Sequence, residues 1–174
     1  LHTARRAPPA PRPHSGDRPN DFQVNKTFAA SQIDPRATGD AWRLTLTGGP
    51  TPPVVLDRAA LAAMNQHTAE LPIACVEGWS TTQVWTGGVP LRDLARLAGV
   101  PNPRSAYVRS LERYGFNQAT LQDNQVLHPD ALLALRVNGA DLSPNHGYPA
   151  RIIVPALPGV HNTKWVASID FRAV

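Results

Sequence analysis

The single cysteine of the chain, Cys75, is the residue whose type and position are best suited to chemistry. It follows a short apolar run (residues 71–74) and precedes Gly78, Trp79 and three hydroxyl residues (80–82). An apolar run that gives way to glycine and polar residues is typical of a strand that ends in a loop. The sequence therefore predicts a loop that presents the Cys75 thiol at the end of a strand.

A lone cysteine can be a buried apolar residue, a nucleophile with a histidine partner, a ligand in a metal cluster, or the one thiolate on a metal that a cofactor brings. A zinc or iron–sulfur site needs several Cys or His ligands at close spacing, and none of the six histidines lies within a few residues of Cys75. A metal cluster is therefore disfavoured. A Cys–His nucleophile stays open, because four histidines could approach the thiol in the fold: His67, His128, His146 and His161.

Further motifs stand in a defined order along the chain. They are Cys-Val-Glu-Gly-Trp-Ser from Cys75, Trp85, Gly-Val-Pro-Leu at 88–91, Pro129 through Val137 with Asn138 and Gly139, His-Gly-Tyr-Pro-Ala-Arg at 146–151, and the segment 159–165. In order and spacing these motifs resemble the molybdopterin-binding domain of the sulfite oxidase superfamily, over roughly residues 20–174. Within it, the Cys75 segment is most similar to the catalytic subunit of the bacterial molybdopterin-dependent protein-methionine-sulfoxide reductases.

The resemblance implies a molybdenum–molybdopterin cofactor, with Cys75 as both the metal ligand and the catalytic residue. A thiolate suits a metal that is already held by the two dithiolene sulfurs of the pterin. The resemblance also implies the residues that contact the cofactor: Asn25, Lys26, Ser110, His146, Arg151, Thr163 and Lys164, with Asn20 as a competitor of Asn25. Among these, Arg151 and Lys164 are expected to bind the phosphate of the cofactor. His146 is expected to form a hydrogen bond to the pterin and not to touch the metal.

The resemblance also bears on the substrate and the redox partner. Sulfite oxidases place basic residues just after the cysteine, whereas this chain has Glu77 and Trp79 there, and the charge of Glu77 would oppose a sulfite dianion. We therefore expect oxygen-atom transfer in the reductive direction, on a small-molecule or protein-bound sulfoxide or on an N-oxide. The expected electron donor is a membrane haem protein. Two alternatives stay open: a cofactor-free cysteine hydrolase, and a non-catalytic domain that binds the pterin or a protein partner.

Length and charge constrain the fold and the partners. A chain of 174 residues and 18.8 kDa is long enough for one well-buried domain and short for two. The formal charge is +4, but residues 1–19 carry four Arg against one Asp, which contributes +3 and leaves +1 for the rest. The basic balance thus belongs mostly to the N-terminal segment, and we do not expect nucleic acid as a partner.

The N-terminal segment, residues 1–19, contains five prolines and no aromatic residue, which is the composition of a disordered linker. The chain begins at Leu1, and the segment lacks the apolar core of a signal peptide. We expect a fragment cut downstream of a signal or membrane region, and therefore an extracytoplasmic location, periplasmic or at the outer face of a membrane. The domain itself is expected to span residues 20–174.

Local patterns predict the elements that position these residues. Strands are expected at 20–27 (an edge strand), 42–47, 54–56, 106–111, 150–154 and 165–171; helices at 58–66, with Asp57 as N-cap, and 91–98, ended by Gly99; and a hairpin over 132–142 that turns at Asn138 and Gly139. Short strands outnumber helices. We therefore predict an α+β fold with a mixed β-sheet or barrel-like core and short helices, which is also the fold that the resemblance implies.

Overall fold

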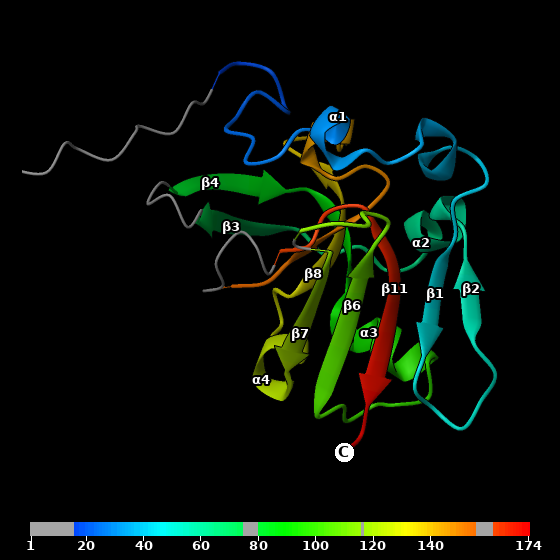
Figure 1. The fold of residues 1–174 in the computed structure, drawn as a ribbon. Coiled ribbons are helices and arrows are strands. Elements are labelled where there is room, and N and C mark those ends of the chain that lie inside the picture. Colours follow the sequence, from blue (N-terminus) through cyan, green and yellow to red (C-terminus); the bar gives the residue numbers. More distant parts are fainter. Residues whose placement is uncertain (1–15, 75–79, 116, 156–161) are drawn as a thin grey trace, which may run out of the picture.

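The computed structural model describes residues 16–74, 80–115, 117–155 and 162–174 (Figure 1). Its largest sheet has five strands in the order β2-β1-β11-β6-β7. These strands are β1 (Leu44–Thr47), β2 (Val54–Leu56), β6 (Ser105–Ser110), β7 (Gln118–Gln122) and β11 (Val166–Arg172). Because β1 pairs with β11 in parallel and every other neighbour is antiparallel, the sheet is mixed, as predicted.

Two smaller sheets complete the strands that the structure describes. One has the order β10-β8-β5, with β9 paired to β8, and consists of β5 (Gly87–Pro90), β8 (Leu132–Val137), β9 (Ala140–Asp141) and β10 (Arg151–Ile153). The other is an antiparallel hairpin of β3 (Ala69–Ala74) and β4 (Ser80–Trp85). In Figure 1 this hairpin runs across the direction of β6 and β11.

All helices of the described chain are short. They are α1 (Phe28–Ser31), η1 (Pro35–Thr38), α2 (Arg58–Ala63), α3 (Leu91–Leu97), α4 (Asp123–Val126) and η2 (Pro144–His146). None of these described helices is long and apolar enough to cross a membrane. The predicted α+β class is confirmed, and the described strands form open sheets and no closed barrel.

The main apolar core lies between the five-stranded sheet and α3, which is behind β6 and β11 in Figure 1. Leu94 of α3 is completely buried in this core together with Leu46 of β1 and Val108 of β6. A second apolar cluster joins the β3–β4 hairpin to β8, through Leu71, Trp85 and other buried residues. His146 and Arg151, two of the residues predicted to contact the cofactor, lie against Phe22 and Trp85 of this second cluster.

Several local predictions are confirmed. Asp57 caps α2, since its side chain accepts a 2.7 Å hydrogen bond from the backbone of Ala60. The helix ends at Ala63 and not at Gln66, because the Gln66 side chain folds back and donates to the carbonyl of Leu61 (2.9 Å). Side-chain donors can satisfy the last carbonyls of a helix in place of a further turn.

The hairpin of β8 and β9 also follows the prediction. Asn138 and Gly139 form its turn with φ values of +49° and +86°. Positive φ at both central positions is the requirement of the tight turn that Asn-Gly favours.

Two further local predictions are wrong. The segment 20–27 is not an edge strand apart from a single bridge at Phe22, because Asn20 fixes it from the side: its Nδ2 donates to the Asp141 carbonyl (3.0 Å) and its Oδ1 accepts from the Ser143 backbone (2.8 Å). The hydroxyl residues 80–82 belong to β4 and not to a loop, since they pair with residues 72–74 of β3. Cross-strand pairing outweighed the local polar pattern there.

Candidate functional site

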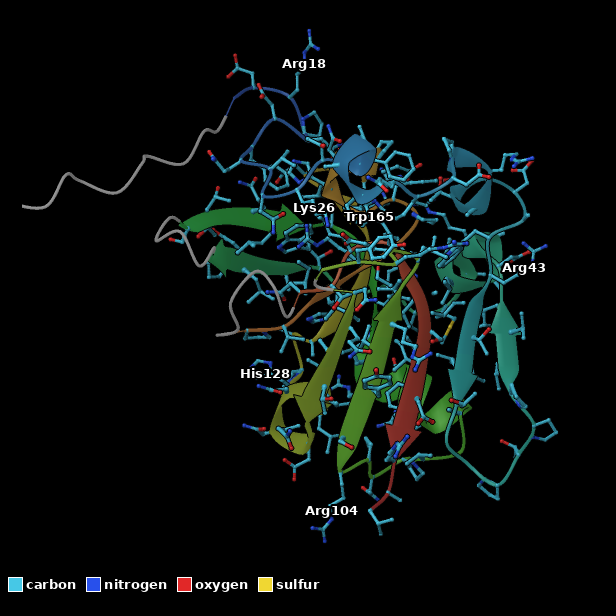
Figure 2. All side chains as sticks on the ribbon, viewed as in Figure 1. Arg18, Lys26, Arg43, Arg104, His128 and Trp165 are labelled. Atoms are coloured by element: carbon cyan, nitrogen blue, oxygen red, sulfur yellow. The ribbon has the colours of Figure 1, made fainter. Side chains whose placement is uncertain are left out.

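Four segments far apart in the sequence meet above the end of β6 where it pairs with the start of β11. They are residues 25–28, residues 110–112, the turn around η2 and the stretch 162–165. Figure 2 shows Lys26 and Trp165 close to each other in this region. Most of the side chains that the sequence predicts for cofactor binding are found here.

Lys164 lies at the centre of this site and is only 8% exposed. Its ammonium donates to the backbone carbonyl of Lys26 and to that of Asn145 (2.9 Å), and it lies 4.6 Å from the centre of the Trp165 ring. Burial, with the nearby charges of Arg151 and Lys26, lowers the pKa of Lys164 to about 7. The folded protein therefore holds this ammonium in an environment that disfavours its charge.

Arg151, at the start of β10, is a second buried cation, 4% exposed. Its two terminal nitrogens donate to the carbonyls of His146 (3.2 Å) and Asn162 (3.1 Å), and its guanidinium lies 5.4 Å from the Trp85 ring centre. Burial lowers the pKa of Arg151 to about 9. Within the described residues no carboxylate forms a salt bridge with Arg151 or with Lys164.

Gly147 brings the two cations together. Its φ is +111°, and an added Cβ would lie 2.9 Å from Cβ of Arg151 and 3.2 Å from Cγ of Lys164. Any larger residue would have to displace both side chains as well as adopt a strained backbone. Glycine at this position therefore allows both cationic side chains to approach the turn after η2.

Two buried side-chain atoms have no hydrogen-bond partner among the described residues: Nε of the Arg151 guanidinium itself, and Oγ1 of Thr163, the residue before Lys164. Buried donors without an acceptor are rare, because each one loses its hydrogen bonds to water. Together with two buried positive charges that no described carboxylate compensates, they suit a ligand with anionic oxygens. The terminal phosphate of molybdopterin has this chemistry, so the residues present fit the cofactor that the sequence predicts.

His146 is buried beside these cations but is a poor base. Its ring stacks on Phe22 with centroids 3.7 Å apart, and its Nε2 donates to the carbonyl of Asn20 at 3.0 Å. Burial, with the charges of Arg151 and Lys164, lowers the pKa of His146 to about 3. The ring is therefore neutral at physiological pH and can offer neutral hydrogen bonds only.

Two other predicted site residues, Ser110 and Asn25, form hydrogen bonds between their side chains and backbone groups of this region. The Ser110 hydroxyl donates to the carbonyl of Lys164 (2.7 Å) and accepts from the backbone of Glu112 (3.0 Å). Lys26 forms an ion pair with Glu112. Asn25 is exposed, and among the described residues its side chain accepts a single, local hydrogen bond, from the backbone of Lys26 (2.9 Å). The structure thus brings Lys26 and Ser110 close to the buried cation Lys164, and leaves Asn25 at the surface.

The sequence did not single out Glu112 or Asn145, which both contact the site. Asn145 accepts from the backbone of Phe28 through its side chain (2.9 Å) and from Lys164 through its carbonyl. Glu112 stands beside Arg113 and the exposed Tyr114, so that its local sequence is that of a surface loop. No short-range signal identifies either residue, since their partners are far away in the chain.

The residues that carry the predicted metal and substrate chemistry, Cys75, Glu77 and Trp79, lie outside the described residues, as does His161. Of the other histidines, His67 pairs with Asp130 (2.8 Å), and the ring of His128 accepts from the backbone of the same residue (3.0 Å). Across the described ranges, no group of three or more His, Cys, Asp or Glu side chains could hold a metal ion.

A surface hollow of about 500 Å³ lies next to the site but is separate from it. It is lined by α1, η1 and the segment 111–114, with Ile33, Leu111 and Tyr114 among its walls. Neither Arg151 nor Lys164 lines it. The chemistry of the buried cations therefore belongs to the region between η2, β10 and residue 164, and not to this hollow.

Known proteins are similar to this chain in sequence. An uncharacterised oxidoreductase of Bacillus subtilis (strain 168), YuiH, is 32% identical over 131 residues, which are 75% of this chain and 65% of that protein. Sulfite oxidase of Arabidopsis thaliana is 32% identical over 132 residues, which are 64% of this chain and 33% of that protein. The chain thus spans about two thirds and one third of the lengths of these relatives.

The fold is also that of a solved structure. The sulfane dehydrogenase SoxCD from Paracoccus pantotrophus superposes with a TM-score of 0.67 at 24% identity, over 78% of this chain and 39% of that one. The sequence matches the family described as oxidoreductase molybdopterin-binding domain over residues 30–174, which is most of the chain and includes the buried cations. The predicted superfamily and cofactor are confirmed at this level: the chain belongs to the family of oxidoreductase molybdopterin-binding domains.

Proposed function

We propose that this chain carries the molybdenum centre of an oxidoreductase that removes an oxygen atom from a sulfoxide or an N-oxide, as the protein-methionine-sulfoxide reductases do. The observation that carries the cofactor part of this proposal is the buried pair of Arg151 and Lys164. Among the described residues the pair has no carboxylate partner, and Nε of Arg151 has no hydrogen-bond acceptor. A protein keeps such charges buried when a ligand compensates them.

The side chains divide the work of holding the cofactor. Arg151, Lys164 and Thr163 would bind its phosphate, and His146, neutral and fixed by Phe22 and Asn20, would offer the pterin a hydrogen bond. Cys75 would supply the one thiolate ligand of the metal. When bound, the cofactor supplies a redox-active molybdenum that exchanges an oxygen atom and two electrons with the substrate.

Lys26, Ser110 and Asn25 are assigned smaller roles. Lys26 and Ser110 would act through the backbone that they fix around Lys164, since their polar atoms already contact that region. Asn25, exposed at the start of the same segment, would reach the cofactor only from the surface.

The substrate part of the proposal rests on the residues that follow Cys75. Glu77 and Trp79 stand where a basic clamp would favour a sulfite dianion, so a neutral or amphipathic substrate is preferred. One observation favours a second candidate, the oxidation of a sulfur oxyanion: the 32% identity to the plant sulfite oxidase. The two candidates differ in the direction of electron flow and in the charge of the substrate.

Electrons and location complete the proposal. Reduction of a substrate oxidises the molybdenum, so a further redox group must return two electrons to it. We propose a haem protein of the membrane as donor and an extracytoplasmic location, supported by the proline-rich composition of residues 1–19, which would suit a tether.

Metal analysis and turnover together test the proposal. Protein from a molybdenum-replete host should contain about one Mo per chain, whereas a cofactor-free cysteine hydrolase would contain none. Methionine sulfoxide and trimethylamine N-oxide should be turned over with reduced viologen, and sulfite should not be oxidised with ferricyanide. Cys75→Ser should abolish turnover and the Mo(V) EPR signal without changing the melting curve. Brisk sulfite oxidation without reductase activity would favour the second candidate, and Mo-replete protein without either activity would favour a non-catalytic domain.

A further inference from the structure

Glu112 is a buried carboxylate to which nothing above assigns a role in the cofactor site. Its side chain is 5% exposed and pairs with the ammonium of Lys26, which is 34% exposed. An ion pair with a buried member contributes little net stability compared with apolar residues of the same size, because the buried carboxylate loses its hydration. The Lys26–Glu112 pair can instead serve to fix one particular arrangement of the chain.

The Lys26–Glu112 pair is connected to Lys164 through the backbone of Lys26. The backbone carbonyl of Lys26 is one of the two carbonyls that accept a hydrogen bond from the Lys164 ammonium. The side chain of Lys26 therefore holds its own residue against Glu112, and its backbone holds the ammonium of the other lysine. The two contacts span 86 and 138 residues of sequence, so local structure cannot supply them.

Glu112 also reaches Lys164 by a second route, through the backbone. Its N–H donates to the Ser110 hydroxyl (3.0 Å), and that hydroxyl donates to the carbonyl of Lys164 (2.7 Å). Glu112 thus belongs to a closed ring of hydrogen bonds. Through Lys26 this ring fixes the side chain of Lys164, and through Ser110 it fixes the main chain of Lys164. Movement of Glu112 would disturb both.

The second acceptor of the Lys164 ammonium depends on the same N-terminal segment. This acceptor is the carbonyl of Asn145, whose side chain accepts from the backbone of Phe28 (2.9 Å). Phe28 in turn lies against Trp165, with ring centroids 6.0 Å apart. If the Lys26–Glu112 pair did not hold residues 25–28 in place, the Lys26 carbonyl would no longer be fixed, and Asn145 would lose its side-chain contact to Phe28.

We propose that Glu112 is a positioning residue that, by anchoring Lys26, places the ammonium of Lys164 at the site of the anionic cofactor. This inference rests on the proposed role of Lys164 in binding the cofactor phosphate. It does not require Glu112 to touch the cofactor, and it gives Lys26 a role in positioning in place of direct contact.

The sequence provides a sharp test, because Lys26 and Lys164 are its only two lysines. Modification with an amine-selective reagent, followed by peptide mass analysis, reports the accessibility of each one separately. In the wild-type protein without cofactor, Lys164 should react slowly. In Glu112→Gln, the rate at Lys164 should rise at least roughly tenfold, because the segment that covers it opens more often. Released pterin per chain, measured by fluorescence, should fall in the same variant.

Matched variants separate positioning from a general loss of structure. Asp93→Asn removes a half-buried carboxylate that pairs with Arg96 in α3, and should change neither the labelling nor the pterin content. The exchange of Lys26→Glu with Glu112→Lys restores the pair and should restore the pterin content. If Glu112→Gln fails to fold, the double variant Lys26→Met with Glu112→Gln, which buries no unpaired charge, should fold and leave Lys164 reactive.

Two results would overturn the inference: Lys164 as protected in a folded Glu112→Gln protein as in the wild type, or unchanged pterin content in that variant. A wild-type protein that never contains pterin would instead refute the proposed function. The labelling experiment would still decide whether Glu112 positions Lys164, because it uses the protein without cofactor.

Discussion

The core around α3 and the site around Lys164 are buried to a similar degree, but the core consists of apolar side chains and the site of charged and polar ones. Leu94 and Leu46 are completely buried among apolar neighbours, whereas Arg151 and Lys164 are buried among carbonyl groups. Burying apolar surface stabilises the fold, and burying an uncompensated charge destabilises it. The apolar core therefore stabilises the fold, whereas the buried charges of Arg151 and Lys164 destabilise the protein as long as no ligand compensates them.

The largest effect is expected in the apolar core. Leu94→Ala should lower the free energy of unfolding by about 2–5 kcal/mol, because it leaves a cavity between α3 and the sheet and alanine is as good a helix former as leucine. Leu97→Ala in the same helix, where the side chain is 43% exposed, is the matched control and should change little. Thermal or urea unfolding measures both. Equal effects at the two positions would contradict the placement of the core.

A smaller effect is expected from pH on the protein without cofactor. The pKa of Lys164 is about 7 when folded against 10.5 ordinarily, so between these values the unfolded chain binds more protons than the folded one. Stability should therefore rise with pH, on the order of 2 kcal/mol from pH 7 to pH 9. Below pH 7 this contribution of Lys164 should no longer change. Urea unfolding at both pH values measures the slope, and Lys164→Met should flatten it; an unchanged slope in that variant would assign it to other groups.

Arg151→Met should have a still smaller effect on the stability of the protein without ligand. Removing the buried charge stabilises the fold, and losing two hydrogen bonds to carbonyls, each worth about 1 kcal/mol, offsets that gain. The variant should therefore stay within about 1 kcal/mol of the wild type. Inorganic phosphate should raise the melting temperature of the wild type and of the control Arg96→Met, and not that of Arg151→Met. A core-sized loss of stability without any effect on phosphate binding would show that Arg151 is purely structural.

The smallest effect is expected at the N-terminus. Deleting residues 1–19 should lower stability by no more than about 1 kcal/mol, because the segment has little apolar surface to bury. Within it, the carbonyl of Pro19 accepts a 2.9 Å hydrogen bond from the Asn138 side chain. Deletion of residues 1–18, which keeps Pro19, is the matched control and should cost even less. A fall of more than a few degrees in melting temperature with either deletion would show that the segment packs on the domain.

The start of the domain at residue 20 and the roles of the individual site residues stay predictions. The prediction that is best supported by the geometry concerns Arg151, Thr163 and Lys164, which motif resemblance singled out and which lie together in the fold. The prediction that the geometry supports least is Asn25, which is exposed and whose side chain, within the part of the chain that the structure describes, forms a local hydrogen bond alone. Cys75, on which the metal chemistry depends, lies outside the described residues.

The sequence by itself determined the elements whose stabilising contacts lie within a few residues: the Asp57 cap of α2, the Asn138–Gly139 turn and the apolar face of α3. Their physical causes are local, since a cap, a turn and a helical repeat each act over one or two turns of chain. Only the tertiary structure decided that the segment 20–27 is held by side chains instead of a strand ladder. It alone decided that Glu112 is buried, because its partner Lys26 is 86 residues away and local sequence carries no information on such a pair.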